Sequence, residues 1–438
     1  SGLVINCDSL DSGNTALQPE AFDCSASNPP FGTKITIKDP RILKQFELPF
    51  LRNKTGGSRA ASLPPDILFL EQNIRLVRPG SGRIAIVLPY QIFSGPATRY
   101  VREWLLRHLK ISAVIDLPAE TFQPHTGTKT CLLVGSRRKV PSKTLSGIRS
   151  YKIFMSVPKW IGHDRRGRPV YRKAEDGSHT DQILTDIQDV HSAYKAFRGG
   201  KDPKDFHKES FVLDASKVLD DSDLHLNAKF HAHSNWLESA NAASSAERSS
   251  NWSQVRLGDV TESVFCPGRF KRNYVSSGEN AVPFLGGTNT SQFVVETSKY
   301  LSDQDPILDQ VRVSEGWILV TRSGSTGIVS VVPKSWDGWA ISEHVIRIVP
   351  DAKKVNPAYL YAYLKTEHAK AQLAQGVFGS VIDEITPEYI QNLTIWIPKS
   401  AATHRKIAEK VAVGESMRSN ALEAIVEGIG ELDYLLSK

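Results

Sequence analysis

Apolar and polar residues alternate in short blocks along the first third of the chain. Runs rich in β-branched and aliphatic residues predict strands at residues 3–6, 22–27, 82–89, 111–118 and 130–136. Between them, residues 65–76 and 97–109 carry apolar side chains at helical spacing and predict helices. Strands that alternate with helices are typical of a parallel sheet with crossover helices. The pattern therefore predicts half of a doubly wound α/β domain.

A basic stretch and a further helix follow this α/β region. The segment DRRGRPVYRK, residues 164–173, is strongly charged. After it, one predicted helix repeats apolar side chains every three or four positions, at Ile183, Ile187, Val190, Tyr194 and Phe197. We expect this helix to pack on the preceding domain. Residues 238–251 are small and polar, which is typical of an exposed connector and marks the clearest domain boundary.

Beyond the connector, short strand-like runs separated by turn residues extend to residue 398. A predicted helix at residues 358–375 accompanies them, so this part of the chain is expected to be an α+β domain. From residue 403 to residue 436 the spacing is helical, with a narrow apolar seam at Leu422, Ile425, Ile429, Leu432 and Leu436. A single helix of this length measures roughly 50 Å at about 1.5 Å per residue. Such a seam requires a partner.

Composition changes this picture little. At 438 residues the chain can form two or three domains, and its 40% hydrophobic and 23% charged residues are ordinary for a soluble globular protein. The longest apolar runs are too short to cross a bilayer, and the first residues lack the pattern of a signal peptide. Four widely spaced cysteines favour neither a disulfide framework nor a zinc site, so we expect a cytoplasmic protein without membrane contact. The formal charge of +7 is compatible with a polyanionic partner.

The segment FDCSASNPPFG places four residues of chemical interest after a predicted strand: Asn28, Pro29, Pro30 and Phe31. Open α/β sheets bind ligands at the carboxyl ends of their strands. An asparagine oxygen and a carbonyl held rigid by proline can both accept hydrogen bonds from the amino group of a base, which directs the nitrogen lone pair towards a methyl donor. The aromatic ring can stack on a base that has left the duplex. The alternative is an Asn-Pro turn closed by a buried phenylalanine.

The residues around this motif resemble a known family. FDCSASNPPFG, PDILFLEQNIRLVRPGSGRIAIVLPYQIF and YVREWLLRHLKISAVIDLPAETFQPHTGTKTCLLV together are similar to the carboxyl half of the modification subunit of type I restriction systems, a γ-class adenine-N6 DNA methyltransferase. The resemblance covers residues 1 to about 138. It implies that residues 28–31 are catalytic and that S-adenosyl-L-methionine is the cofactor. By the same resemblance Asp8 lies near the adenine of the cofactor, although a strand-terminal or capping role is an equal alternative.

The second half of the chain resembles another subunit of the same systems. WSQVRLGDV, GWILVTRSGSTG, PAYLYAYLKT and GSVIDEITPEYIQNLTIWIPKSAATHRKIAEKV are similar to one target recognition domain of the specificity subunit and its spacer helix, from Trp252 to Lys438. Basic residues beside Phe270 and Tyr274, or beside a Gly/Ser turn, suit phosphate and base contacts. The candidate DNA-binding residues are Arg269, Lys271, Arg272, Arg322 and Ser323. A solvated hairpin tip is the alternative for each of them.

Two features depart from the family patterns. The family has a Gly-rich cofactor loop and an acidic residue on strands before its NPPF motif. We find neither, so we expect this chain to lack the cofactor-binding half and not to hold S-adenosyl-L-methionine alone. One recognition domain is found where specificity subunits usually have two. No metal site is expected, because His225, His231 and His233 have no companion cysteine or carboxylate cluster and fit packing or surface roles.

Together these observations predict an α/β fold with a partial doubly wound methyltransferase sheet, followed by an α+β recognition domain and a long helix. The expected segments are the carboxyl part of the methyltransferase domain (1–150), a basic and helical extension (151–237), a linker (238–251), the target recognition domain (252–402) and the spacer helix (403–438).

The expected function is site-specific adenine-N6 methylation of DNA in a bacterial restriction-modification system. A DNA-recognition module with an incomplete, non-catalytic methylase half is the alternative, and methylation of RNA or of protein glutamine is a weaker one. The expected partners are double-stranded DNA and, through the spacer helix, another copy of the chain or another restriction-modification subunit.

Overall fold

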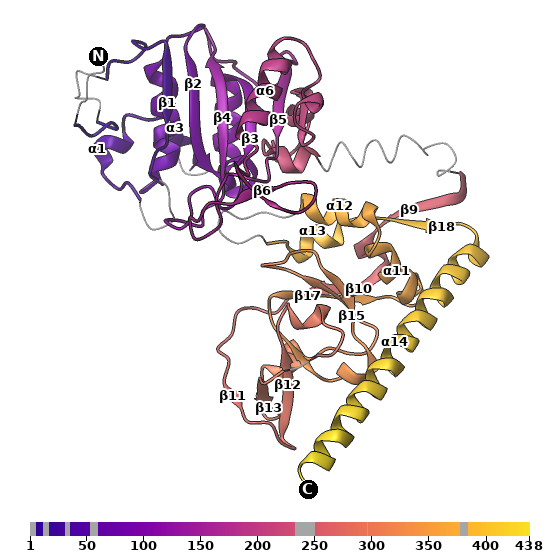
Figure 1. Ribbon diagram of the computed structural model, residues 1–438. Coiled ribbons are helices and arrows are strands. Elements are labelled where there is room, and N and C mark those ends of the chain that lie inside the picture. Colours follow the sequence, from indigo (N-terminus) through magenta and orange to yellow (C-terminus); the bar gives the residue numbers. More distant parts are fainter. Residues whose placement is uncertain are drawn as a thin grey trace. The chain divides into compact units, whose positions relative to one another are not determined.

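The computed structural model describes residues 6–11, 17–30, 36–52, 60–232, 250–295, 297–376 and 384–438. Within these ranges the chain divides into two compact units, and the division falls after residue 232. Each unit has its own hydrophobic core, so each is described by itself. Figure 1 shows the elements of both units along the chain.

A six-stranded mixed sheet forms the centre of the first unit, in the order β1-β2-β4-β3-β5-β8 (Figure 1). Its strands are β1 (Cys24–Ser27), β2 (Arg83–Pro89), β3 (Leu109–Asp116), β4 (Thr130–Arg137), β5 (Lys152–Ser156) and β8 (Ser210–Asp214). β1 is parallel to β2 and β3 is parallel to β5, whereas β4 runs antiparallel between β2 and β3. The carboxyl ends of β1, β2, β3 and β5 therefore lie along one side of the sheet, named here the carboxyl edge.

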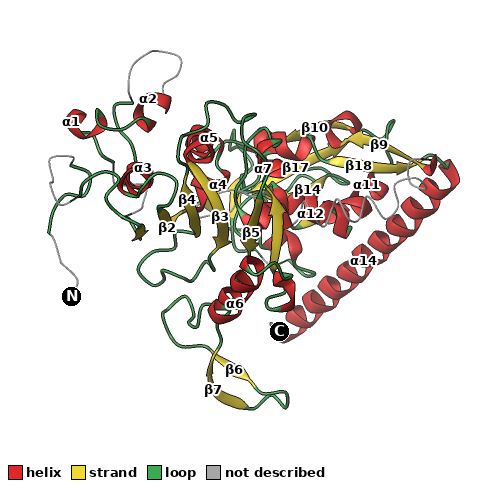
Figure 2. Cartoon of the chain, turned by 90° about the horizontal axis from the view of Figure 1, so that it is seen from above, coloured by secondary structure: helices red, strands yellow, loops and turns green. Residues whose placement is uncertain are grey.

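Helices pack on both faces of this sheet. On one face, α3 (Pro65–Leu76), α4 (Tyr90–Ser94) and α5 (Arg99–His108) contribute to the main core of the unit. On the other face, α6 (Ile187–Arg198) packs against Phe154 of β5 and Ala113 of β3. Three short helices and a hairpin complete the unit: α1 (Pro40–Leu43), α2 (Leu48–Arg52), α7 (Ser216–Leu219), β6 (Tyr171–Lys173) and β7 (His179–Ile183). Figure 2 shows the β6–β7 hairpin projecting away from the sheet.

Two sequence-based expectations for this unit were wrong, and each has a local cause. The sheet is mixed and not parallel throughout, because residues 117–129 join β3 to β4 as a loop without a crossover helix. Ile183 ends β7 and is not on the helix, since α6 begins only at Ile187. The strand expected at residues 3–6 lies almost entirely outside the described residues, and Asn6 is not in a strand.

The second unit contains two four-stranded sheets and a strand pair. The antiparallel sheet has the order β10 (Thr261–Phe265), β17 (Val345–Pro350), β14 (Ile318–Thr321) and β15 (Val329–Val331). The mixed sheet has the order β11 (Tyr274–Val275), β13 (Tyr300–Ser302), β12 (Ala281–Leu285) and β16 (Ala340–Ile341). The first and last strands of the unit pair antiparallel, namely β9 (Trp252–Arg256) and β18 (Thr394–Pro398).

The helices of the second unit are α10 (Leu308–Val311), α11 (Pro357–Leu364), α12 (Glu367–Gln375), α13 (Pro387–Gln391) and α14 (Ala401–Leu436). The single helix expected at residues 358–375 is in fact two, because Thr366 adopts an extended conformation and caps α12 through the N–H of Ala369. The long terminal helix is continuous and begins after Ser400, whose side chain caps it. Within the described ranges, no helix has both the length and the apolar character that a membrane span needs.

Candidate functional site

β1 delivers Asn28 to the carboxyl edge of the sheet. Ser27, the last residue of β1, is in register with Ile86 of β2, and Asn28 is the first residue beyond the strand. The side chain of Asn28 is exposed, Pro29 is buried and Pro30 is exposed, while Phe31 lies outside the described residues. The hydroxyl of Ser25 ties β1 to α3, because it donates to Oδ1 of Asn73 at 2.5 Å. The strand thus presents an exposed amide at a fixed strand end.

Two further strands bring polar side chains to the carboxyl edge, and sequence reasoning missed both. Tyr90 follows β2, and its hydroxyl accepts a hydrogen bond from Nδ2 of Asn227 at 2.6 Å. Asp116 ends β3 and accepts hydrogen bonds from the main-chain N–H groups of Ala228 and Lys229, at 3.0 and 2.8 Å. Burial raises the pKa of Asp116 in spite of these bonds. The segment that leads out of the first unit is therefore fastened to the ends of β2 and β3.

Sequence reasoning also missed two further residues at the carboxyl edge, one with a hydrogen-bond acceptor and one with an aromatic ring. Asn227 is 2% exposed, and its Oδ1 has no hydrogen-bond partner among the described residues. Phe122 is half-buried in the loop of residues 117–129, which follows β3. Tyr90 directly follows a predicted strand, and Phe122 lies four residues after the end of another, so these positions could have identified both. No comparable signal exists for Asn227, because it reaches the edge from a distant part of the chain.

Asp8 lies on an exposed turn. Its Oδ1 accepts a hydrogen bond from the main-chain N–H of Leu10 at 2.9 Å, and its carbonyl oxygen accepts one from Asp11 at 3.3 Å. This geometry fits the capping alternative for Asp8. A contact between this carboxylate and the adenine of a cofactor stays a prediction.

The histidines before the connector pack within the first unit. Nδ1 of His225 lies 2.6 Å from Oδ2 of Asp221. The ring of His225 stacks on Phe230, with 4.2 Å between the ring centroids. His231 is buried and bonds the carbonyl oxygen of His225 at 2.7 Å. His233 lies outside the described residues. Both described histidines are thus held by protein groups.

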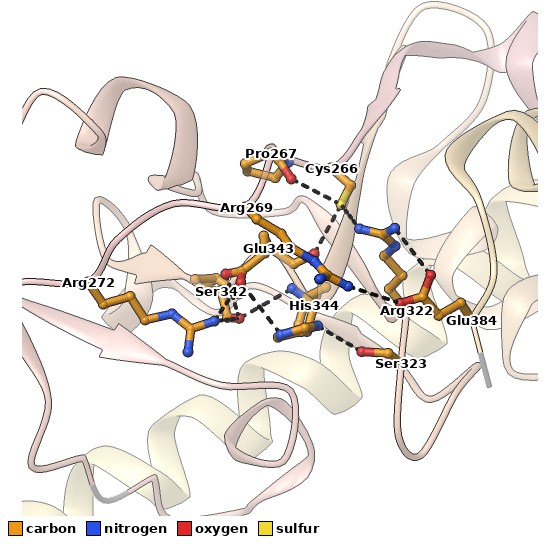
Figure 3. Close-up of polar contacts among 12 residues, drawn as sticks. Cys266, Pro267, Arg269, Arg272, Arg322, Ser323, Ser342, Glu343, His344 and Glu384 are labelled. Atoms are coloured by element: carbon orange, nitrogen blue, oxygen red, sulfur yellow. Dashed lines mark hydrogen bonds and ion pairs between the residues drawn. The ribbon is translucent and has the colours of Figure 1, made fainter. Parts of the chain in front are cut away.

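In the second unit, four of the five candidate DNA-binding residues meet in one polar cluster (Figure 3). The basic and hydroxyl members of this cluster are Arg269, Arg272, Arg322 and Ser323, and its other ionisable members are Cys266, Glu343, Glu384 and His344. The fifth candidate, Lys271, is exposed and has no partner among the described residues. The candidates differ in how firmly the protein holds them.

Arg272 is held inside the cluster. Its Nη2 lies 2.6 Å from Oε1 of Glu343, which is 5% exposed, and its guanidinium carbon lies 5.9 and 5.6 Å from the ring centroids of Phe270 and Phe284. Burial acts to raise the pKa of Glu343, but the hydrogen bond from Arg272, a main-chain hydrogen bond and the positive charges of Arg272 and His344 together outweigh it, so that the pKa is lowered. The charge of Arg272 is therefore already compensated by a carboxylate, and a DNA contact of this residue stays a prediction.

Arg322 and Ser323 are held in part, whereas Arg269 is nearly free. Arg322 lies 3.4 Å from Oε2 of Glu384, and the hydroxyl of Ser323 lies 2.8 Å from Nδ1 of His344. Arg269 is 79% exposed, and its Nη2 comes only within 4.0 Å of Glu384 (Figure 3). The cluster therefore leaves Arg269 and Lys271 as the cations best able to meet a phosphate.

A fully buried arginine fixes the turn that carries Glu343 and His344. The guanidinium of Arg347 donates to the carbonyl oxygens of Val311, Ile341, Ser342 and Val345. Burial lowers the pKa of Arg347 to about 10. Because these four carbonyls surround one planar group, the acidic side of the cluster has a fixed shape.

Arg272→Ala should destabilise the second unit by about 1–3 kcal/mol, because it leaves the buried carboxylate of Glu343 without its main partner. The lowered pKa of Glu343 means that this pair stabilises the fold above the unfolded-state pKa and that the contribution is lost as pH falls through the folded-state pKa. Urea unfolding followed by circular dichroism at neutral and acidic pH measures the difference. Adding Glu343→Gln should recover much of the loss, and equal stability of Arg272→Ala and the wild type would contradict the pairing.

The fold and these sites define a chain that joins an α/β unit with polar side chains at its carboxyl edge to a β-rich unit with a basic polar cluster. Residues 3–233 match the family described as N-6 DNA Methylase, which is more than half of the chain, so the chain belongs to this family. Residues 249–413 match the Type I restriction modification DNA specificity domain. The resemblance and the fold class expected from the sequence are confirmed. The N-6 DNA methylase match extends well beyond the resemblance, which ended near residue 138.

Solved structures of related systems resemble parts of the chain. A modification subunit of a putative type I restriction enzyme from Vibrio vulnificus YJ016 is 19% identical, with a TM-score of 0.29, over 45% of this chain and 34% of that one. The HsdS subunit from Thermoanaerobacter tengcongensis is 16% identical, with a TM-score of 0.29, over 51% and 58%. The type IIG restriction endonuclease BpuSI is 12% identical, with a TM-score of 0.32, over 82% and 46%. The chain thus spans between about a third and somewhat over half of these proteins. No curated protein matches the chain.

Proposed function

We propose that the enzyme containing this chain transfers a methyl group to the N6 atom of adenine in a specific DNA sequence, within a bacterial restriction-modification system. The observation that carries the proposal is the exposed Asn28, held at the end of β1 in a chain of the N-6 DNA methylase family whose second unit is a specificity domain. S-adenosyl-L-methionine, when bound, supplies the methyl group.

The residues of the carboxyl edge suit a flipped adenine. The side-chain oxygen of Asn28 and a carbonyl oxygen that precedes a proline accept the two hydrogens of the N6 amino group, so its lone pair points towards the methyl donor. Phe31 stacks on the base, and Phe122 offers a second ring at the same edge. The exposed carboxylate of Asp8 is an acceptor suited to the amino group of the cofactor's adenine. These roles follow from the chemistry of the side chains and their places after the strands.

Methyl incorporation into duplex DNA tests the proposal. The enzyme that contains this chain is incubated with labelled S-adenosyl-L-methionine and a pool of duplexes of random sequence, and the products are digested to nucleosides. Labelled N6-methyl-2′-deoxyadenosine in a subset of sequences is the expected result. Binding of selected duplexes without any methyl transfer would favour a recognition module with a non-catalytic methylase half.

The second unit should bind duplex DNA through Arg269 and Lys271. Arg269→Ala combined with Lys271→Ala should make the dependence of log affinity on log salt shallower by roughly one for each phosphate that is no longer bound. Fluorescence anisotropy of labelled duplex over a series of salt concentrations measures the slope. Lys353→Ala with Lys354→Ala removes two exposed charges elsewhere in the unit and is the matched control. An unchanged slope in the first pair would reject these residues as phosphate ligands.

A further inference from the structure

A long excursion leaves the carboxyl edge at the end of β5 and returns to the sheet through α6. It consists of residues 157–186 and includes the β6–β7 hairpin (Figure 2). Because β5 is parallel to β3, the excursion starts on the same side of the sheet as Asn28. Its two ends are tied together by Asp186, whose Oδ2 accepts hydrogen bonds from the main-chain N–H groups of Lys159 and Trp160, at 2.6 and 3.1 Å.

A tight turn within this excursion is built around Asp164. One carboxylate oxygen accepts hydrogen bonds from the main-chain N–H groups of Arg166 and Arg168, at 2.8 and 3.0 Å. The other oxygen accepts from the guanidinium of Arg168 at 2.8 Å. These bonds lower the pKa of Asp164 to about 2, and the hydrogen bond from the main-chain N–H of Arg168 has the largest effect. Gly167 closes the turn with a φ of +77°, a conformation that few other residues adopt without strain.

The turn presents two adjacent arginines that have no partner among the residues that the structure describes. Arg165 and Arg166 are exposed, and neither side chain has a hydrogen bond or ion pair within the described part of the chain. The other two arginines of the stretch are occupied, since Arg168 pairs with Asp164 and Arg172 donates to the carbonyl oxygen of Thr185 at 3.0 Å. The carboxylate of the turn therefore sets its shape and leaves two guanidinium groups for an anion. Because the turn is already ordered, less conformational entropy is lost when it binds an anion.

The turn lies beside the carboxyl edge. Gly167 packs closely against Pro124, which belongs to the loop that follows β3. A Cβ atom added to Gly167 would lie only 3.1 Å from Cδ of Pro124. From β1 to β5 the sheet has four strand spacings of about 4.8 Å, or roughly 19 Å in all. A duplex rises about 3.4 Å per base pair, so this span corresponds to roughly six base pairs. A duplex whose target base meets Asn28 can therefore also pass the turn.

We propose that Arg165 and Arg166 bind backbone phosphates of the duplex that flanks the target adenine, so that the methylase unit holds DNA independently of the specificity domain. Arginine suits this role, because its planar guanidinium forms paired hydrogen bonds with phosphate oxygens. The inference rests on the proposed function, since it takes duplex DNA to be the substrate. It adds a sequence-independent contact, which fixes the register of the duplex on the sheet and carries no base preference.

The full chain with Arg165→Ala and Arg166→Ala tests this site. Anisotropy of a fluorescein-labelled duplex of mixed sequence is followed over a series of potassium chloride concentrations. The slope of log affinity against log salt should become shallower by roughly 0.9 for each phosphate that is no longer bound, or about 1.8 for the pair. Arg165→Lys with Arg166→Lys keeps both charges and should retain most of the slope. Lys143→Ala with Arg149→Ala removes two exposed charges at the opposite edge of the sheet, between β4 and β5, and is the matched control.

The outcomes separate this site from the proposed function. A reduced slope in the Arg165/Arg166 pair alone, with unchanged thermal unfolding, supports the phosphate site. If the wild type binds DNA and the slope is the same in all variants, the phosphate site is refuted while DNA binding by the chain stands. If the wild type does not bind duplex DNA at any salt concentration, both the phosphate site and the proposed function fail.

Discussion

Asn28→Ala should reduce methyl transfer to duplex DNA by roughly two to three orders of magnitude and leave DNA affinity unchanged. The size follows from the removal of one fixed polar group at a reacting centre. Asn28 is exposed at the end of β1, so its substitution disturbs no packing in the described structure, and the fold should persist. DNA affinity should hold, because the specificity domain and the Arg165–Arg166 turn do not include this residue.

Labelled methyl incorporation beside a gel shift measures both quantities for the same preparation of the enzyme. Asn392→Ala is the matched control, since this asparagine lies in the second unit and donates to the carbonyl oxygen of Glu388 in its own helix. Phe31→Ala should act differently from Asn28→Ala. It removes a stacking interaction of about 1–3 kcal/mol and should weaken capture of the target base. Full methylation by Asn28→Ala would end the catalytic assignment.

Local patterns predicted the elements that local forces determine. The helix expected at residues 65–76 is α3 with the same bounds, because Pro64 precedes it, Pro65 is its first residue and apolar side chains line its buried face. The strand expected at residues 82–89 is β2, whose alternate residues Ile84, Ile86 and Leu88 enter the core. In both cases the information lies within one element. The position of Asn28 directly after β1 was predicted for the same reason, since a strand end can be read from the sequence.

Contacts between distant residues could not be predicted in this way. In the segment GRFKRNY, Arg269 and Arg272 are equivalent by composition and spacing. The structure separates them, because Glu343, 71 residues from Arg272, is buried against it and leaves Arg269 in solvent. The hydrogen bonds of residues 227–229 to Tyr90 and Asp116, at the ends of β2 and β3, also join residues that are far apart in the sequence. A sequence identifies which cations are present, and the fold decides which of them remain free for DNA.

The same distinction applies to the basic stretch of residues 164–173. By composition it is a charged run, and such runs usually form a solvated surface. Hydrogen bonds to Asp164 convert part of it into a fixed turn. Within the described residues, two of its four arginines, Arg168 and Arg172, have partners and the other two do not. The sorting depends on turn geometry, which a count of charges does not contain. It places free cations beside the edge at which the proposed chemistry takes place.

Ile425→Asp combined with Leu432→Asp should convert a dimer of the full chain into monomers. The first half of α14 packs on its own unit, where Ala408 is buried against the core that includes α11. Its second half exposes the seam, with Ile425 at 42%, Ile429 at 52% and Leu432 at 57%. A groove of about 290 Å³ lined by Trp336, Trp339, Leu422 and Val426, among others, runs beside this part of the helix. Apolar side chains so arranged fit a second helix.

The expected effect is large, because a symmetric dimer buries each substituted residue twice. At about 1.5–3 kcal/mol for each isoleucine or leucine, four buried side chains contribute at least about 6 kcal/mol, or roughly four orders of magnitude in Kd. Light scattering over a range of protein concentrations measures the change. Asn420→Asp with Tyr434→Asp adds the same charges on the side of the helix away from Ile425 and Leu432 and should leave the dimer intact. A wild-type chain that stays monomeric at high concentration would refute self-association and leave the seam to another subunit of the system.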